Sequence, residues 1–559
     1  MVLNKISGRA PSKTNNKREN ERENERENER RQGRRGLCYP TPLSYPNFVP
    51  EFKRRPAMRP PNMLFIQVDQ MSASALSAYG NSFSRTPHLA QLASAGAVFE
   101  NAYCNFPLCA PSRFSMASGQ LCSIIGAFDN AAELPASVPT YAHYLRALGY
   151  QTALAGKMHF IGPDQHHGFE QRLTAEIYPA DFSWVPRWGD EGARDTNDAS
   201  SVTVAGPCAR SVQIDYDEEV AAKAVQHLYD IARAASDDSR PFFLQVSFTH
   251  PHEPYLCLRE YWDMYDGVDI PPPTVRALPA EQHDAHALRL LKDFGMLDYA
   301  FTAAQIQRAR RAYYGSVSYV DALIGRVLDA LNATGMRGDT AVIFTADHGD
   351  MLGERGMWFK KHFYEPALRV PLLIAAPRFA PKRISELVSL VDLLPTFCGL
   401  AGGRHDDVES LAGGDLIPLL TRDGDAPPAR TVYAEYLAEA ALAPIFMLRR
   451  GRWKYITSTA DPKLLFDLSA DPHETNNLVA APAHAGTVAE LEEEAQARWD
   501  SAQLTRAIVT SQNRRRKILQ AHRYGAPPRW DGDSPGEVSR WYRGKGSYNA
   551  WAFDYLPDD

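Results

Sequence analysis

The chain has 559 residues, of which 44% are hydrophobic and 23% charged, a balance typical of a soluble globular protein with one large domain and smaller ones. The formal net charge is −6, and the first 36 residues hold 11 basic and 6 acidic side chains, so the rest is more acidic than the whole. An acidic body argues against a nucleic-acid-binding protein. No apolar run approaches the roughly 18 residues of a membrane-spanning helix, which excludes an integral membrane protein.

Residues 1–60 are expected to form a disordered low-complexity extension and a Pro-rich linker. Residues 15–36 repeat Arg-Glu-Asn-Glu and have almost no apolar side chain to bury. A solvated single helix is the alternative form, and a basic arm for nucleic acid or a membrane surface is the less favoured function. The first residues lack the apolar segment of a secretory signal, and the 7 cysteines include no Cys-x-x-Cys pair. We therefore expect a cytoplasmic protein without a disulfide framework or a zinc site.

Short apolar runs alternate with helical patterns from residue 61 to about residue 425. Strands buried on both faces of a sheet give such near-continuous apolar runs, and the alternation predicts a doubly wound α/β sheet sandwiched by helices. Thr86 followed by Pro87 predicts the start of a helix. Residues 426–559 change to short strands, an acidic helix at 487–499 and an aromatic tail, which predicts a smaller C-terminal α+β domain. The expected strands of the large sheet are 63–68, 152–156, 242–248, 340–346 and 370–376.

Polar side chains directly follow four of these strands. Ligands of an open α/β sheet bind beyond the carboxyl ends of the strands, so these side chains are site candidates. Each alone could be a structural polar group, but titratable groups at four ends favour a functional site. The candidates are Asp69 and Gln70, Lys157 and His159, His250 and His252, and Asp347 and His348.

The most specific motif is LCAPSR, from Leu108 to Arg113, with Gly119 six residues after the arginine. This is the sequence by which sulfatases have their cysteine oxidised to formylglycine, although a buried inert cysteine is the ordinary alternative for Cys109. The chain resembles the type I sulfatases of the alkaline phosphatase superfamily, whose large mixed sheet it is then expected to share. Within that family it is similar to the choline sulfatase branch from Asn62 to about Trp530, through GKMHFIGPDQHHGFE, SFTHPHEPY, FTADHGDMLGERGMWFKKHFYE and LFDLSADPHETNNL.

The resemblance implies hydrolysis of a sulfate ester, choline-O-sulfate, by a formylglycine made from Cys109 by a maturation enzyme. Its hydrated aldehyde offers a hydroxyl that attacks sulfur, and the second hydroxyl then expels sulfate as the aldehyde re-forms. A thiol has no second hydroxyl and could not expel sulfate in this way. The resemblance also implies a divalent metal, Ca²⁺ or else Mn²⁺ or Mg²⁺, and Gln70 stands where many members have a second aspartate. The implied metal ligands are Asp69, Cys109, Asp347 and His348, with Gln70 as a possible fifth.

The resemblance further implies the groups around the sulfate. Arg113 orients the hydrated aldehyde, and Lys157, Lys360 and Asn130 donate to the sulfate oxygens. His250 or Lys360 is the expected acid for the leaving alkoxide. His159 is a further catalytic candidate, but for His159 and His252 a core or supporting role is an equal alternative. Glu354 and Arg355 are expected to be structural.

A quaternary ammonium cannot donate a hydrogen bond, so aromatic faces and carboxylates recognise it. Similarity to choline sulfatases nominates Trp184, Glu435 and Asp531, the last from a neighbouring subunit of a homo-oligomer, a dimer or a tetramer. Asn197 and Gly532 depart from the histidine and tyrosine that members of this branch tend to carry. A phosphonate or phosphate monoester hydrolase is therefore the alternative enzyme, and a binding protein with an unconverted cysteine is the alternative without catalysis.

Overall fold

The computed structural model describes residues 60–188, 199–406, 408–422, 430–525, 530 and 552–558. The low-complexity extension lies outside this described part, as do Asn197, Asp531 and Gly532. Residues from Pro60 onward form one compact unit. No helix in the described ranges combines the length and the apolar character that crossing a membrane requires.

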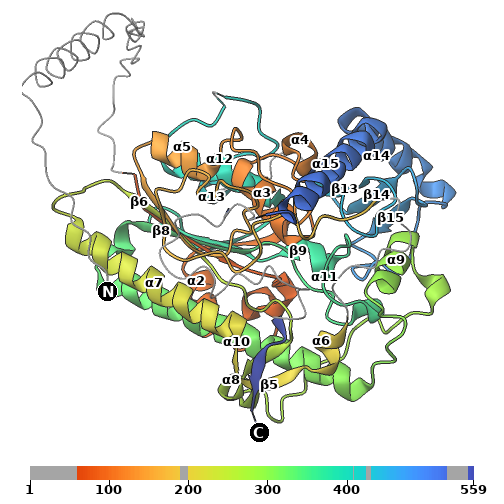
Figure 1. Cartoon of the computed structure of the whole chain (residues 1–559), viewed down its shortest axis with the longest axis horizontal. Coiled ribbons are helices and arrows are strands. Elements are labelled where there is room, and N and C mark those ends of the chain that lie inside the picture. Colours follow the sequence, from red (N-terminus) through yellow and green to blue (C-terminus); the bar gives the residue numbers. More distant parts are fainter. Residues whose placement is uncertain are drawn as a thin grey trace, which may run out of the picture. The chain divides into compact units, whose positions relative to one another are not determined.

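A nine-stranded mixed sheet forms the centre of the described chain (Figure 1). Its order is β11-β2-β10-β8-β1-β6-β3-β4, with β9 paired to β2. Pairing is parallel except around β10 and β9, which run antiparallel to their neighbours. The strands are β1 (Asn62–Val68), β2 (Ala97–Tyr103), β3 (Gln151–Gly156), β4 (Gln171–Arg172), β6 (Phe242–Ser247), β8 (Thr340–Ala346), β9 (Arg369–Val370), β10 (Leu372–Ala375) and β11 (Lys382–Ser389).

The five expected strands are present within a residue or two of their predicted bounds, except that Pro371 divides the last into β9 and β10. The middle strands β1, β6 and β8 are buried along almost their whole length, which explains their continuous apolar sequences. The sequence did not predict β2 and β11, because β2 contains Glu100 and Asn101 and β11 contains several charged residues.

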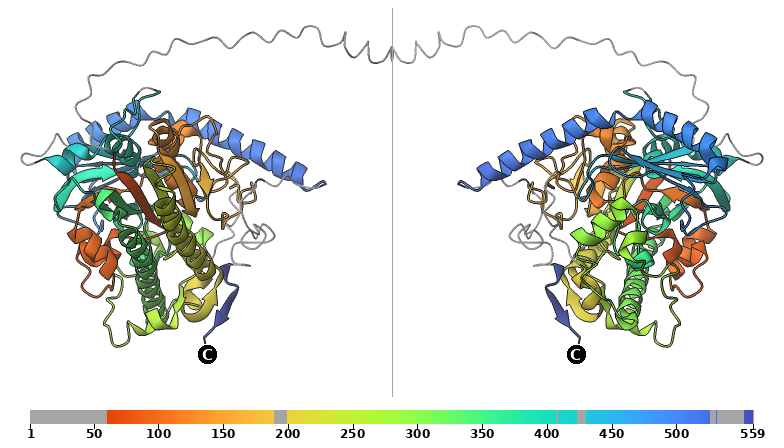
Figure 2. Two further views of the ribbon diagram at one scale, coloured as in Figure 1. Left: turned by 90° about the vertical axis from the view of Figure 1, so that its left-hand side faces the viewer. Right: turned by 90° about the vertical axis from the view of Figure 1, so that its right-hand side faces the viewer.

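Helices cover both faces of this sheet (Figure 1). The long helices α7 (Val212–Ala234) and α10 (Ala303–Ala333) lie side by side on one face with α2 (Pro87–Ser94) (Figure 2). The other face carries α3 (Cys109–Ser118), α5 (Tyr141–Ala147), α12 (Leu393–Leu400) and α13 (Ile417–Thr421). The doubly wound α/β class is confirmed. The remaining short helices are α4 (Cys122–Ile125), α6 (Ser200–Thr203), α8 (Arg259–Asp263), α9 (Ala285–Asp293) and α11 (Glu365–Leu368).

A second, antiparallel sheet follows residue 430. It consists of β12 (Thr431–Tyr436), β13 (Ile445–Arg450), β14 (Trp453–Ser458) and β15 (Leu464–Asp467), packed against α14 (Ala485–Arg498). Helix α15 (Ser501–His522) returns to the large sheet's loops, where Arg515 and Asp129 form a buried ion pair. The tail ends in β16 (Tyr555–Pro557), which joins β5 (Gly206–Ser211) and β7 (Leu256–Leu258). The predicted smaller C-terminal α+β part is therefore present, and its boundary at residue 426 lies outside the described residues.

Candidate active site

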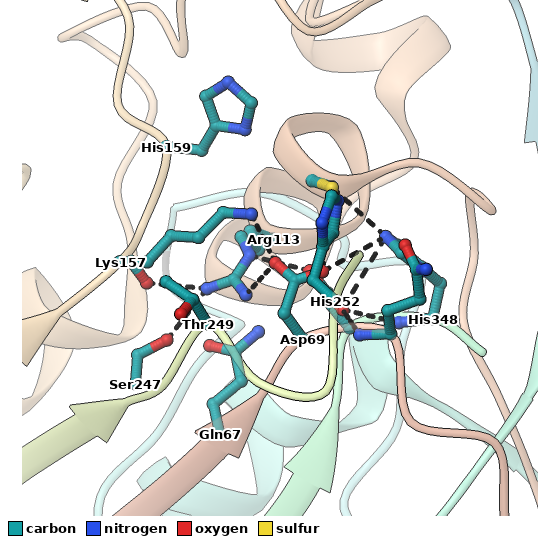
Figure 3. A network of polar contacts seen from close by, with 12 residues as sticks. Gln67, Asp69, Arg113, Lys157, His159, Ser247, Thr249, His252 and His348 are labelled. Atoms are coloured by element: carbon teal, nitrogen blue, oxygen red, sulfur yellow. Dashed lines mark hydrogen bonds and ion pairs between the residues drawn. The ribbon is translucent and has the colours of Figure 1, made fainter. Parts of the chain in front are cut away.

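The ends of the central strands bring the predicted polar residues together. Asp69 follows β1 and Asp347 follows β8, and these parallel strands are neighbours in register. Lys157 follows β3 and forms an ion pair with Asp69, while Ser247 ends β6 (Figure 3). All four side chains are buried, so the charges depend on one another for stabilisation.

Arg113 connects these strand ends. It projects from α3 and is fully buried. Its guanidinium donates to Asp69 Oδ2 at 2.9 Å and to Asp347 Oδ2 at 2.8 Å. It also donates to the carbonyl oxygen of Lys157 at 2.6 Å and to Ser247 Oγ at 2.8 Å. Burial opposes the charge on Arg113, but the two carboxylates outweigh it and raise the pKa of the guanidinium. Arg113 thus holds one oxygen of each carboxylate and leaves the other oxygen to face Cys109 and His348.

Four potential metal ligands lie within 4.8 Å of one another: Asp69, Cys109, Asp347 and His348. Cys109 Sγ is 3.2 Å from His348 Nε2 and 3.8 Å from Asp69 Oδ1. His348 Nδ1 is 3.0 Å from the carbonyl oxygen of Gly349, which assigns the proton to Nδ1 and leaves Nε2 to face the cluster. Two carboxylate oxygens and an imidazole nitrogen, all buried, fit a divalent cation.

The Gln70 side chain lies between charged groups rather than between ligands of that cluster. Its backbone has a left-handed φ of 62°. Its Nε2 donates to Glu253 Oε2 at 2.6 Å and to Asp350 Oδ2 at 2.7 Å, and its Oε1 accepts from Lys360. Because two carboxylates and an ammonium surround the amide, its orientation is determined by these partners. Ligation of a metal by Gln70 stays a prediction.

His252, and not His250, faces the site. His252 Nε2 is 2.7 Å from Lys360 Nζ, and its Nδ1 is 2.7 Å from the carbonyl oxygen of Glu253. His250 instead directs Nδ1 to Asp217 Oδ2 at 2.7 Å, with its ring edge on Tyr319. The role of His250 as the acid stays a prediction: Asp217 of α7 engages its Nδ1, whereas His252 contacts Lys360.

Lys157 and His159 lie on the side of the cluster away from His348 (Figure 3), and Trp184 packs against His159. Lys157 Nζ lies 4.0 Å from the centre of the Tyr178 ring. The His159 ring packs against Tyr178 and edge-on against Trp184, with centroids 4.9 and 5.7 Å apart. Both His159 ring nitrogens are buried without a hydrogen-bond partner among the described residues. Burial, together with the charge of Lys157, lowers the pKa of His159 well below its usual range, so its ring is neutral.

Two other candidates have clear positions. Asn130 Oδ1 accepts from the Ala110 amide at 3.0 Å, directly behind Cys109. Glu435 is fully buried and accepts from Ser123 and from Trp499 Nε1, so the structure does not direct it to Trp184. Its nomination as a ligand-binding carboxylate stays a prediction that these contacts do not support.

Several residues of the site were not predicted. They include Ser247, which contacts Arg113, and Tyr178, which contacts Lys157 and His159. Glu253 and Asp350 both bind Gln70 and lie within the quoted motifs, one residue after His252 and two after His348. Glu354 accepts from the amides of two loop residues and Arg355 donates to backbone carbonyls, as expected of structural residues.

Comparisons with known proteins identify the family of this chain. The family model described as Sulfatase matches residues 61–403, and the model described as N-sulphoglucosamine sulphohydrolase, C-terminal matches residues 353–500. The choline-sulfatase of Rhizobium meliloti (strain 1021) is 43% identical over 479 residues, covering 84% of this chain and 93% of that protein.

Solved structures agree on the fold. The phosphonate monoester hydrolase SpPMH from Silicibacter pomeroyi superposes with a TM-score of 0.64 at 25% identity, covering 78% of this chain and 95% of that one. BT1596, a 2-O GAG sulfatase, superposes with a TM-score of 0.60 at 24% identity, covering 86% and 97%. The chain therefore belongs to the sulfatase family and has its alkaline phosphatase-like fold.

Proposed function

We propose that this sulfatase hydrolyses choline-O-sulfate to choline and sulfate. The observation that carries the proposal is the 43% identity to a choline-sulfatase over most of both chains. The position of Trp184 beside His159 supports it, because an aromatic face beside the sulfate-binding side chains suits a quaternary ammonium leaving group.

Cys109 is the residue to be converted to formylglycine, which requires a maturation enzyme. It opens α3, where the helix N-terminus favours negative charge. Asp69, Asp347 and His348 would hold a divalent metal next to residue 109, with Ca²⁺ as the first candidate and Mg²⁺ or Mn²⁺ as alternatives. When bound, such an ion neutralises sulfate charge and favours the ionised hydroxyl of the formylglycine hydrate.

Lys157, His159 and Asn130 bind and orient the sulfate group. Arg113 fixes the carboxylates of Asp69 and Asp347. Lys157 and His159 donate to sulfate oxygens from the side of the site away from His348. Asn130 uses its Oδ1 for Ala110, which leaves Nδ2 to donate. Because these donors are fixed before substrate arrives, little reorganisation accompanies the reaction.

Lys360 and His252 form the acid pair. His252 carries its proton on Nδ1, toward the Glu253 carbonyl, so its Nε2 accepts from the Lys360 ammonium. Lys360 thus carries the proton that the leaving alkoxide needs, and His252 orients it. His250 stays the alternative acid.

The ammonium pocket combines Trp184 with carboxylates. Trp188 Nε1 donates to the carbonyl of Ala438 at 2.7 Å, which brings the chain around Glu439 to the segment that carries Trp184. Glu439 is therefore a candidate carboxylate beside Glu435 within the described chain, and Lys361 and Tyr436 already contact it. Asp531 of a neighbouring subunit in a homo-oligomer stays a further candidate.

Hydrolysis of phosphonate or phosphate monoesters is the second candidate, favoured by the TM-score of 0.64 to a phosphonate monoester hydrolase. The test compares kcat/KM for choline-O-sulfate, 4-nitrophenyl sulfate and a phenyl phosphonate ester. We expect choline-O-sulfate to be the best substrate, and a preference for the phosphonate would refute the proposal. The mass of the peptide containing residue 109 tests conversion, and an unmodified cysteine in active enzyme would refute the formylglycine mechanism.

A further inference from the structure

The turn that carries Lys157 and His159 starts at the edge of β6, where the Lys157 amide donates to the Ser247 carbonyl at 3.0 Å, and side chains hold it on the side of β4. Backbone pairing between β3 and the following segment stops where the Leu173 amide donates to Leu154. Beyond that point Thr174 Oγ1 accepts from the Gly156 amide at 2.8 Å. The Glu176 carboxylate accepts the hydrogen bonds from the next amides of the turn.

Glu176 Oε2 accepts from two consecutive amides, Met158 at 2.9 Å and His159 at 2.7 Å. The same oxygen accepts from Arg172 Nη2 at 2.9 Å, and Oε1 accepts from the Ile177 amide at 3.0 Å. The carboxylate is 6% exposed, so these charge-assisted bonds are shielded from water.

The partner of Glu176 is itself fixed. Arg172 Nη1 donates to the backbone carbonyl and the side-chain oxygen of Gln165 at 2.9 and 2.7 Å. Gln165 in turn donates to the carbonyls of Phe160 and Gly162. The chain on both sides of His159 is therefore anchored to one buried cluster.

This anchoring determines where two sulfate-binding side chains point. His159 has a left-handed φ of 62°, which costs a residue other than glycine about 1–2 kcal/mol. Hydrogen bonds to a buried carboxylate of about 1.5–3 kcal/mol each offset that cost. The Lys157 carbonyl is bound by Arg113 at the same time, so the turn links the Glu176 cluster to the ligand carboxylates.

We propose that Glu176 is a positioning residue for sulfate binding: it fixes the turn from which Lys157 and His159 reach the substrate. The inference rests on the proposed roles of Lys157 and His159. It assigns to Glu176 no contact with the substrate.

The test compares Glu176→Ala with Glu176→Gln in the mature full-length enzyme. The glutamine keeps an oxygen for the Met158 and His159 amides, whereas alanine removes it. For Glu176→Ala we expect kcat/KM to fall by about 100-fold for choline-O-sulfate and for 4-nitrophenyl sulfate alike, since sub-ångström positioning is lost. The inhibition constant for inorganic sulfate should rise about tenfold, and Glu176→Gln should recover most of both losses.

Asp321 provides the matched control. It is a buried carboxylate of α10 that accepts from the consecutive amides of His88 and Leu89 at the start of α2. Asp321→Ala should lower the melting temperature and leave the sulfate inhibition constant within about twofold of wild type. If Glu176→Ala behaves like Asp321→Ala, the proposed positioning role is refuted.

Two further variants complete the experiment. Glu176→Ala leaves Arg172 as an unpaired buried charge, so if it does not fold, the double variant with Arg172→Met is compared with Arg172→Met alone. Lys157→Ala tests the underlying assignment. An unchanged sulfate inhibition constant in Lys157→Ala would refute the role of Lys157 and this inference with it. A raised constant in Lys157→Ala but not in the Glu176 variants would refute the role of Glu176 alone.

Discussion

Removal of Lys360 should slow hydrolysis more for an ester with a strongly basic leaving group than for an ester with a weakly basic one. Lys360 Nζ and His252 Nε2 are 2.7 Å apart, and two positive charges at that distance would repel by about 6 kcal/mol at an effective dielectric constant of about 20. Only one of the two can be charged. Burial opposes the charge on Lys360, but in the unconverted protein Cys109, Glu253 and Asp69 outweigh it and raise the Lys360 pKa. Glu253 and Asp69 keep favouring the charged lysine after Cys109 is converted, so we assign the proton to Lys360.

Choline leaves as an alkoxide, which needs a proton in the transition state, whereas 4-nitrophenol leaves as a stable phenolate. General acid catalysis contributes about 100- to 10,000-fold. We therefore expect Lys360→Ala to lower kcat/KM for choline-O-sulfate by about 1,000-fold, which corresponds to about 4 kcal/mol. The loss for 4-nitrophenyl sulfate should be about tenfold, because only the electrostatic contribution of the ammonium disappears.

The assay measures steady-state kinetics of both esters for the wild type and Lys360→Ala, with and without added ethylamine. Ethylamine should restore part of the choline-O-sulfate activity, because it can supply the missing acid. His250→Gln serves as a comparison, since that ring faces Asp217. Equal losses for both esters, without rescue by the amine, would refute the assignment of Lys360 as the acid.

Four further predictions follow from the site and the core. Cys109→Ala should abolish multiple turnover of choline-O-sulfate, and near-normal turnover would refute the covalent mechanism. Asp347→Asn should lower both bound metal, measured by elemental analysis, and kcat, since its carboxylate lies in the ligand cluster. Trp184→Ala should lower kcat/KM for choline-O-sulfate by about tenfold but leave the aryl sulfate nearly unchanged, because a desolvated cation–aromatic contact is worth about 0.5–2 kcal/mol. Burial lowers the pKa of His167 from 6.5 to about 4, so the unfolded chain binds a proton between those values that the folded chain does not, and stability falls as pH drops through this range. The free energy of unfolding falls by about 3 kcal/mol over this pH range. His167→Phe should therefore flatten the pH dependence of the melting temperature below pH 6.5.

The sequence alone determined the central part of the fold and nominated the candidate site residues. Parallel strands buried on both faces need continuous apolar sequences, so β1, β6 and β8 were recognisable. Since such strands present their carboxyl ends at one edge, Asp69 and Asp347 could be predicted to converge there. The motif at Cys109 added the proposed nucleophile, and the structure places Cys109 Sγ 3.2 Å from His348 Nε2.

Other features depended on contacts between residues far apart in the chain. His250 and His252 stand two positions apart in one loop, and Asp217, which is 33 residues from His250, decides which ring faces the site. Glu435 was expected beside Trp184, yet Ser123 and Trp499 bind its carboxylate.

The turn at His159 also combines a feature that the sequence predicts with one that only long-range contacts determine. The sequence identifies a lysine and a histidine after a buried strand, but neither residue by itself specifies a left-handed backbone. That conformation is stabilised by Glu176 and Arg172, which the pairing of β4 with β3 places beside the turn. Periodicity in a sequence reports which face of a strand is buried, because burial repeats along the element. Side-chain direction in a loop has no such repeat, and so only the tertiary hydrogen bonds decided it.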